Sequence, residues 1–306
     1  MLTIALSTLP VVLLIALGTI LKRLPLLTEP GWQAIDRIVY WVLFPALLFR
    51  AVATADFGST DLKPVMAALV GTVLATSLLV VVLRRLWGTD GPGLASLVMG
   101  ATRFNTFLGV AVAERLHGAS GVALTALCIA VLVPVVNVVS VLALAIWGNA
   151  GGRAGIAGFV RQVLTNPLIL ACLAGAAVRW TGVEVPGPLM GAIGIAGQAS
   201  LALGLLAIGA GLDFAALGAS LRPLLAGTVL KLAVQPAIGF ALLTAAGVSG
   251  LPFAIALFWL ALPAAPSSYV MARTMGGDAR LMAGLLTAQL LVGLLTLPVV
   301  LEYFAS

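Results

Sequence analysis

Charged residues are scarce in this sequence: only 8% of its 306 residues carry a charge, whereas about 25% is usual in soluble domains. Hydrophobic residues make up 62%. These values exclude an ordinary soluble protein and predict an all-α polytopic membrane protein. The net charge of +6 would suggest a nucleic-acid partner in a soluble protein. In a membrane protein it indicates basic cytoplasmic loops, and we expect no nucleic acid.

Residues that carry catalysis or bind metals are also few. There is one histidine, His117, and the two cysteines, Cys128 and Cys172, lie in apolar stretches that suit packing. The segment Gly118-Ala-Ser-Gly121 resembles an intramembrane serine protease motif, but such an enzyme needs a histidine on another helix. No zinc-ligand cluster or phosphate-binding loop is present. We therefore expect no enzyme, no cofactor and no metal.

Carboxylates are missing from the middle of every apolar stretch. All candidates lie near the ends of these stretches, namely Asp36, Asp56, Asp61, Glu114, Asp213 and Asp278. A transporter of protons or sodium built on broken helices would need carboxylates at mid-membrane depth. Their absence favours an anion as the substrate.

Ten apolar stretches approach or exceed the roughly 20 residues that a membrane-spanning helix needs. They are Thr3–Leu21, Trp32–Ala53, Pro64–Leu86, Gly93–Ala113, Gly121–Trp147, Val163–Trp180, Leu189–Gly211, Leu221–Ala246, Pro252–Met275 and Ala279–Tyr303. The longest connection, from Gly148 to about Gln162, divides them into residues 1–150 and 151–306, with five spans in each half.

The two halves share residues at a steady offset. Pro10 and Pro167 lie 157 positions apart, and Gly71-Thr-Val-Leu74 recurs as Gly227-Thr-Val-Leu230 at an offset of 156. Because five is odd, the second half must enter the membrane from the opposite side. The pattern predicts an inverted repeat, as in many secondary transporters.

The basic residues in the predicted loops are unequally divided between the two sides of the membrane. One side has ten: Lys22, Arg23, Arg37, Arg84, Arg85, Arg153, Arg161, Arg222, Arg273 and Arg280. The other has four: Arg50, Lys63, Arg115 and Arg179. The positive-inside rule places the ten in the cytoplasm, so both termini are expected outside.

The ninth stretch contains Pro263 and Pro266, which cannot both lie in an unbroken helix. Each proline frees the carbonyl four residues earlier, those of Trp259 and Leu262, and such backbone must face protein or water. We expect a discontinuous helix, with Pro266 at the first position of its second half. A simple proline kink is the alternative.

The repeat predicts a break in the fourth stretch as well. Its middle, Gly100-Ala-Thr-Arg103-Phe-Asn105-Thr106, contains no proline, but Asn105 is a good N-cap for a helix beginning at Thr106. Two half-helix N-termini and the charge of Arg103 would then face one anion site. Arg103 could instead snorkel or pair with a carbonyl, and Asn105 could make an interhelical hydrogen bond.

The sequence offers two sets of candidate site residues. The expected substrate-binding residues are Arg103, Asn105, Thr106, Asn137, Pro263, Pro266, Ser267 and Ser268. The expected supporting or counter-charged residues are Lys231, Gln235 and Gln198. Lys231 and Gln235 lie four residues apart on one helical face, just before Pro236.

Several segments resemble bacterial members of the auxin efflux carrier family, which includes malate and malonate permeases. They are Arg103-Phe-Asn105-Thr-Phe-Leu-Gly109, Val133-Pro134-Val-Val-Asn137, Thr165-Asn166-Pro167 and Leu262-Pro263-Ala-Ala-Pro266. The resemblance implies ten spans in inverted five-span repeats, with crossed and broken helices 4 and 9. It also implies a scaffold of spans 1, 2, 6 and 7, a moving transport domain of spans 3–5 and 8–10, and often a homodimer.

The same resemblance assigns roles to individual residues. Asn105 and Asn137 are similar in position to substrate ligands, and Asp61 and Lys63 to a polar cluster that supports the site. Many relatives have a proline in the fourth-span break, where this sequence has Ala111.

We therefore expect an elevator-type permease or efflux carrier for a small organic anion, a carboxylate, in the bacterial inner membrane. Coupling to H⁺ or Na⁺ is left open. The alternatives are a sodium-coupled symporter of the bile-acid-carrier type, which would use the carbonyls of Trp259 and Leu262, and a membrane receptor or sensor that does not transport.

Overall fold

The computed structural model describes residues 2–24, 26–54, 62–149, 164–218 and 220–304, and all regular structure in these ranges is helical. In the first half the elements are α1 (Leu2–Arg23), α2 (Glu29–Ile38), the π-helical turn η1 (Val39–Leu43), α3 (Phe44–Ala53), α4 (Lys63–Val82), α5 (Arg84–Trp87), α6 (Gly91–Thr102) and α7 (Thr106–Trp147).

In the second half they are α9 (Pro167–Thr181), α10 (Gly187–Ala210), the 3₁₀ turn η2 (Ala215–Gly218), α11 (Leu221–Val229), the π-helical turn η3 (Leu230–Val234), α12 (Gln235–Ala245), α13 (Gly250–Leu260), α14 (Ser267–Met275) and α15 (Ala279–Phe304).

These elements coincide with the ten apolar stretches of the sequence. Among the described residues, five helical segments are long and apolar enough to cross a membrane: Lys63–Val82, Gly91–Trp147, Gly187–Ala210, Leu221–Ala245 and Ala279–Leu297. The prediction of a polytopic all-helical membrane protein is thus confirmed. The inverted repeat of ten spans stays a prediction.

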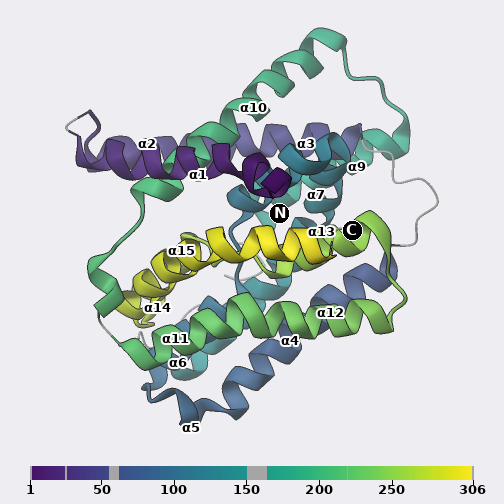
Figure 1. The fold of residues 1–306 in the computed structure, drawn as a ribbon. Coiled ribbons are helices and arrows are strands. Elements are labelled where there is room, and N and C mark those ends of the chain that lie inside the picture. Colours follow the sequence, from purple (N-terminus) through teal and green to yellow (C-terminus); the bar gives the residue numbers. More distant parts are fainter. Residues whose placement is uncertain (1, 25, 55–61, 150–163, 219, 305–306) are drawn as a thin grey trace.

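The helices pack in two groups. The first helix group comprises α1, α2, η1, α3, α9 and α10: α10 packs along both α1 and α3, and α3 packs against α9 (Figure 1). The second helix group comprises α4 to α7 and α11 to α15. Helices α7 and α15 of the second group contact the first group.

Helices α1 and α10 approach closely at small residues. A Cβ atom on Gly18 would lie 2.0 Å from the Leu206 carbonyl oxygen, and one on Gly209 would lie 1.9 Å from the Ile15 carbonyl oxygen. The Thr19 hydroxyl donates to the Gly209 carbonyl at 3.0 Å. Small residues with a hydroxyl bridge are the usual contact between helices in lipid, where apolar burial drives no association.

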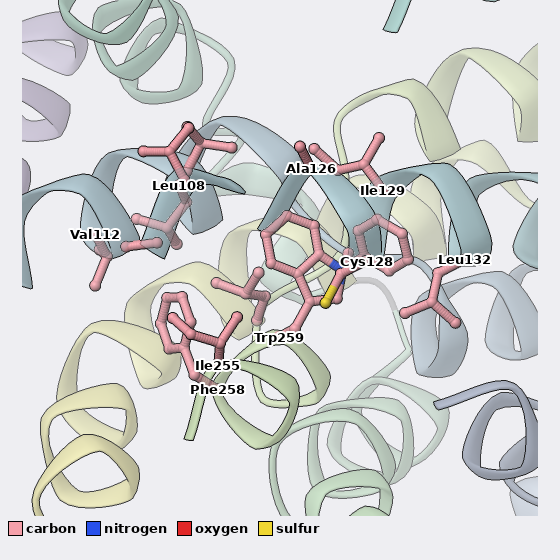
Figure 2. Close-up of a cluster of buried hydrophobic side chains, with 14 of the residues drawn as sticks. Leu108, Val112, Ala126, Cys128, Ile129, Leu132, Ile255, Phe258 and Trp259 are labelled. Carbon is pink, nitrogen blue, oxygen red and sulfur yellow. The ribbon is translucent and has the colours of Figure 1, made fainter. Parts of the chain in front are cut away.

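The largest buried cluster surrounds Trp259 of α13. Figure 2 shows the Trp259 indole among side chains of α7, including Leu108 and Ile129. Gly109 allows this packing, because a Cβ at that position would lie 2.5 Å from Trp259 Cζ3. The cluster fixes α13 against α7 next to the candidate site.

Helix α7 changes conformation at Gly118, where φ is 56° and ψ is −143°. Residues with a Cβ rarely adopt such a positive φ. Gly118 therefore separates two helical parts of α7, which contain the end of the predicted fourth span and the whole of the fifth.

Candidate functional site

The predicted break in the fourth stretch is present. Helix α6 ends at Thr102, residues 103–105 are not helical, with extended dihedrals at Arg103 and Asn105, and α7 begins at Thr106. The Asn105 side-chain oxygen accepts a hydrogen bond from the Leu108 N–H at 3.1 Å. Asn105 is thus the N-cap expected from the sequence, and a cap is sufficient to open this helix without a proline.

The break in the ninth stretch is also present. Helix α13 ends at Leu260 and α14 begins at Ser267. Pro266 was expected to be the first residue of the second half-helix. It has helical dihedrals, but it lies directly before α14 and is its N-cap. The Trp259 carbonyl is not left free, contrary to expectation, because the Leu262 N–H reaches it at 3.4 Å through a tight last turn.

The half-helix N-termini differ from expectation in one respect. In α14 the N–H groups of Ser268 and Tyr269 donate to the carbonyls of Ala265 and Pro266 at 2.9 and 3.0 Å. They are therefore not free donors for a ligand. The first helical residues, Thr106 of α7 and Ser267 of α14, still begin at the breaks, so both positive helix ends are directed there.

The two breaks contact each other directly. The Asn105 N–H donates to the Pro263 carbonyl at 2.7 Å, which joins the α6–α7 break to the α13–α14 break. Both residues are buried. This hydrogen bond satisfies an amide and a carbonyl that no helix partners at this depth.

A single glutamine of α15 fastens the breaks to neighbouring helices. Its side-chain oxygen accepts from the Ala264 N–H at 3.0 Å, and its nitrogen donates to the carbonyls of Gly100 at 3.0 Å and Gly227 at 3.1 Å. We call these three hydrogen bonds the Gln289 clamp. The residue is fully buried. In the sequence it was one of several span amides and was not among the candidate site residues.

Arg103 is the charged centre of the site. Its guanidinium donates to the Asn137 side-chain oxygen at 2.7 Å, the Ser140 hydroxyl at 3.3 Å and the Ser267 hydroxyl at 3.0 Å. Among the described residues it donates to side chains and not to a backbone carbonyl. Only 8% of its surface is exposed, and among the described residues no carboxylate contacts it. Of these hydrogen-bond partners of Arg103, Asn137 and Ser267 were expected at the site, whereas Ser140 was not.

The charge of Arg103 is therefore held by neutral acceptors alone. Its Nε atom is buried and has no hydrogen-bond partner in the described part of the chain. The Ser268 hydroxyl, also buried, is likewise without one. Ser267 and Pro266 beside them are exposed. A buried guanidinium with spare donors suits a carboxylate ligand, which would supply the missing negative charge.

Tyr40 is the site residue that comes from the first helix group. It lies in η1 of the first helix group, is half-buried and is near Arg103. Nothing in the sequence around Tyr40 marked it as a site residue. The π-helical turn that carries it is a feature frequently found at functional sites.

The supporting residues are scattered. Lys231 and Gln235 contact each other in the second helix group, with the lysine Nζ 2.5 Å from the glutamine Oε1. Gln198 is exposed on α10, and Lys63 lies at the start of α4. Asp61 lies outside the described residues. Among the described residues, no three His, Cys, Asp or Glu side chains form a group that could hold a metal.

The comparison with protein families covers almost the whole chain. The model of the membrane transport protein family matches residues 3–301. The chain belongs to this family, the auxin efflux carriers. It is also 27% identical over 303 residues to an uncharacterized transporter of the archaeon Methanothermobacter thermautotrophicus, with 95% of each chain covered.

The resemblance of the four sequence segments to the auxin efflux carrier family is thereby confirmed at the level of the family. As a member of the auxin efflux carrier family, the chain is a multi-pass membrane transporter and not an enzyme.

Proposed function

We propose that this auxin efflux carrier family member is a secondary carrier for small organic anions that bear a carboxylate. The observation that carries the proposal is Arg103: a buried guanidinium at the crossing of two helix breaks, bonded to Asn137, Ser140 and Ser267, with no carboxylate beside it among the described residues. A charge in such a place is costly unless a ligand compensates it.

The carboxylate would bind beside Arg103, between the N-terminal ends of α7 and α14. These ends each contribute roughly half a positive charge. Asn105, Thr106 and Ser268 lie at the same ends and would position the ligand. With the inside negative, export of one net negative charge gains about 2.3 kcal/mol per 100 mV, so the membrane potential favours efflux wherever the species that crosses carries a net negative charge.

The packing supports an elevator-type movement. Arg103, Asn137 and Ser267 all belong to the second helix group, while Tyr40 belongs to the first. In this proposal the first helix group is a fixed scaffold, with a homodimer contact, and the second carries the site across the membrane. The ten spans would form two inverted repeats in a bacterial inner membrane with both termini outside, as the loop charges predict.

The sodium-coupled alternative is less favoured by the geometry. It needs free carbonyls at Trp259 and Leu262, and the Trp259 carbonyl already accepts a hydrogen bond from the Leu262 N–H. We therefore prefer an anion carrier without a sodium site at the ninth-span break.

The test is uptake of radiolabelled lactate, malate, malonate and indole-3-acetate into proteoliposomes of the purified protein, with and without Na⁺. We expect uptake of at least one carboxylate, lost in Arg103→Gln and kept in a surface control, Arg280→Gln. Equal uptake by wild type and Arg103→Gln would show that the anion site lies elsewhere. Binding without flux would point to a receptor.

A further inference from the structure

Lys231 lies in the middle of the transmembrane segment Leu221–Ala245 and is completely buried. Its ammonium donates to the Gln235 side-chain oxygen at 2.5 Å. The backbone around it forms the π-helical turn η3, and Pro236 follows directly. Such turns are rare in proteins overall, but those that occur are often at functional sites. An isolated lysine in one therefore requires an explanation beyond packing.

No negative charge compensates this lysine within the described part of the chain. The elements packed against η3 are α6, α11, α12 and α15, and α4 packs against α12. The titratable or charged residues on or directly flanking these elements are Lys63, Asp90, Arg103, Arg222, Asp278, Arg280, Glu302 and Tyr303. All but Arg103 belong to the ends of these elements, and none of those whose side chains the structure describes makes an ion pair or hydrogen bond with Lys231. An ammonium buried without a counter-ion is strongly disfavoured.

Lys231 is not itself a ligand of the carboxylate. Its surface is wholly covered, and within the described part of the chain its only hydrogen bond is to Gln235 and it shares no hydrogen-bond partner with Arg103. It is nevertheless connected to the site. Gly227, one turn earlier in α11, accepts a hydrogen bond from Gln289, and Gln289 also accepts one from Ala264 in the ninth-span break.

Gln235 suits both charge states of the lysine. An ammonium needs an acceptor, which the amide oxygen provides. A neutral amine has a lone pair, and it can accept from the amide nitrogen once the side-chain amide rotates. That nitrogen is buried and has no partner in the described residues. The pair can therefore keep a hydrogen bond whether or not the proton is present, which a purely structural lysine does not require.

We propose that Lys231 is the proton-binding site of the transport cycle, so that one proton moves in the same direction as each carboxylate. The amine takes a proton from water on the side where the anion binds, and the ammonium returns it to water on the side where the anion leaves. Opposite charges stabilise each other in a low-dielectric interior, so anion and proton favour each other's binding reciprocally. This inference rests on the proposed carrier function.

Three variants separate a carried proton from a fixed charge. Lys231→Met removes the site while keeping a similar shape. Gln235→Glu places a carboxylate against the ammonium, so that the pair stays ionised throughout the cycle. Lys22→Met is the matched control, because it removes a surface lysine that pairs only with Glu29. A fixed charge returns with the empty carrier and adds nothing to the net charge moved per substrate.

The measurement is the charge moved per radiolabelled anion in proteoliposomes clamped with potassium and valinomycin. For wild type and Lys22→Met we expect no net charge per lactate and one per malate dianion. For Lys231→Met and Gln235→Glu we expect one net charge moved per lactate and two per malate dianion. The same ratios in all four proteins would overturn the proposal. If wild type transports neither anion, the charge per anion is measured with whichever carboxylate of the uptake panel it does transport. If it transports none of them, the carrier function itself fails, and this inference fails with it.

A binding experiment keeps the proposal testable when a variant binds but does not transport. Malate is added to each purified protein in weakly buffered detergent solution containing a pH dye. Wild type should take up one proton per bound malate, and its affinity should weaken by up to tenfold per pH unit as the solution becomes alkaline. Both variants should take up none and show a flat pH dependence. Proton uptake that persists in Lys231→Met would refute the assignment.

Discussion

The Gln289 clamp leads to a prediction whose size follows from its three hydrogen bonds. In Gln289→Leu, the Ala264 N–H and the Gly100 carbonyl lose the partners described above, whereas the Gly227 carbonyl keeps the Leu230 N–H. A buried polar group left unpaired costs about 1–3 kcal/mol, and an ordinary lost hydrogen bond about 1 kcal/mol. The expected loss of stability is therefore about 3–7 kcal/mol.

The assay is thermal unfolding in detergent, together with carboxylate affinity. At about 2–4 °C per kcal/mol, a value typical of domains of 150–250 residues, the unfolding midpoint should fall by at least about 6 °C. Affinity should also fall, because the Ala264 N–H and the Gly100 carbonyl position the two breaks. Stability and affinity should change together in this variant.

Thr287 provides the matched control on the same helix. Its hydroxyl accepts from the Asp213 N–H at 3.0 Å and is fully buried, but it makes no contact with either break. Thr287→Val should lower the unfolding midpoint and leave carboxylate affinity unchanged. An unaltered midpoint in Gln289→Leu, or an equal loss of affinity in Thr287→Val, would refute the role of the clamp.

Three further predictions concern the breaks. Arg103→Lys should raise the KM for carboxylate uptake at least tenfold, because one ammonium cannot reproduce the planar fork of donors, and Arg103→Gln should abolish saturable uptake. Asn105→Ala should lose the cap of α7 and about 1 kcal/mol of stability in thermal unfolding, most of which Asn105→Ser should restore. Gly109→Ala should cost about 1–3 kcal/mol, because its Cβ would overlap Trp259, and an unchanged unfolding midpoint would contradict this packing.

The breaks could be predicted from the sequence because local chemistry determines them. Pro263 and Pro266 cannot continue a helix, and Asn105 can start one. These effects act within a few residues of the chain, so no knowledge of the neighbouring helices was needed. Asn137 was a candidate as an amide within an apolar stretch, and the family resemblance added its role as a substrate ligand.

The partners across helices could not be predicted in this way. Gln289, Ser140 and Tyr40 became site residues only through the contacts between helices, and a span that is apolar on most faces does not show which face meets the site. The same limit explains Gln198, which was expected as a supporting residue but lies exposed on α10. For a polar residue in an apolar helix, the sequence shows how deep in the membrane the residue lies, but not which neighbouring helix its side chain faces.

The contact between the breaks also has a consequence for hydrogen exchange. Non-helical backbone usually exchanges its amide protons quickly, since loops open locally at little cost. Here the amides of Asn105 and Ala264 are bonded to the opposite break and to the Gln289 side chain. Releasing either requires α6, α13 and α15 to separate, so these two amides should exchange as slowly as the middle of the helices around them. The least regular part of the backbone would then be among the last to open.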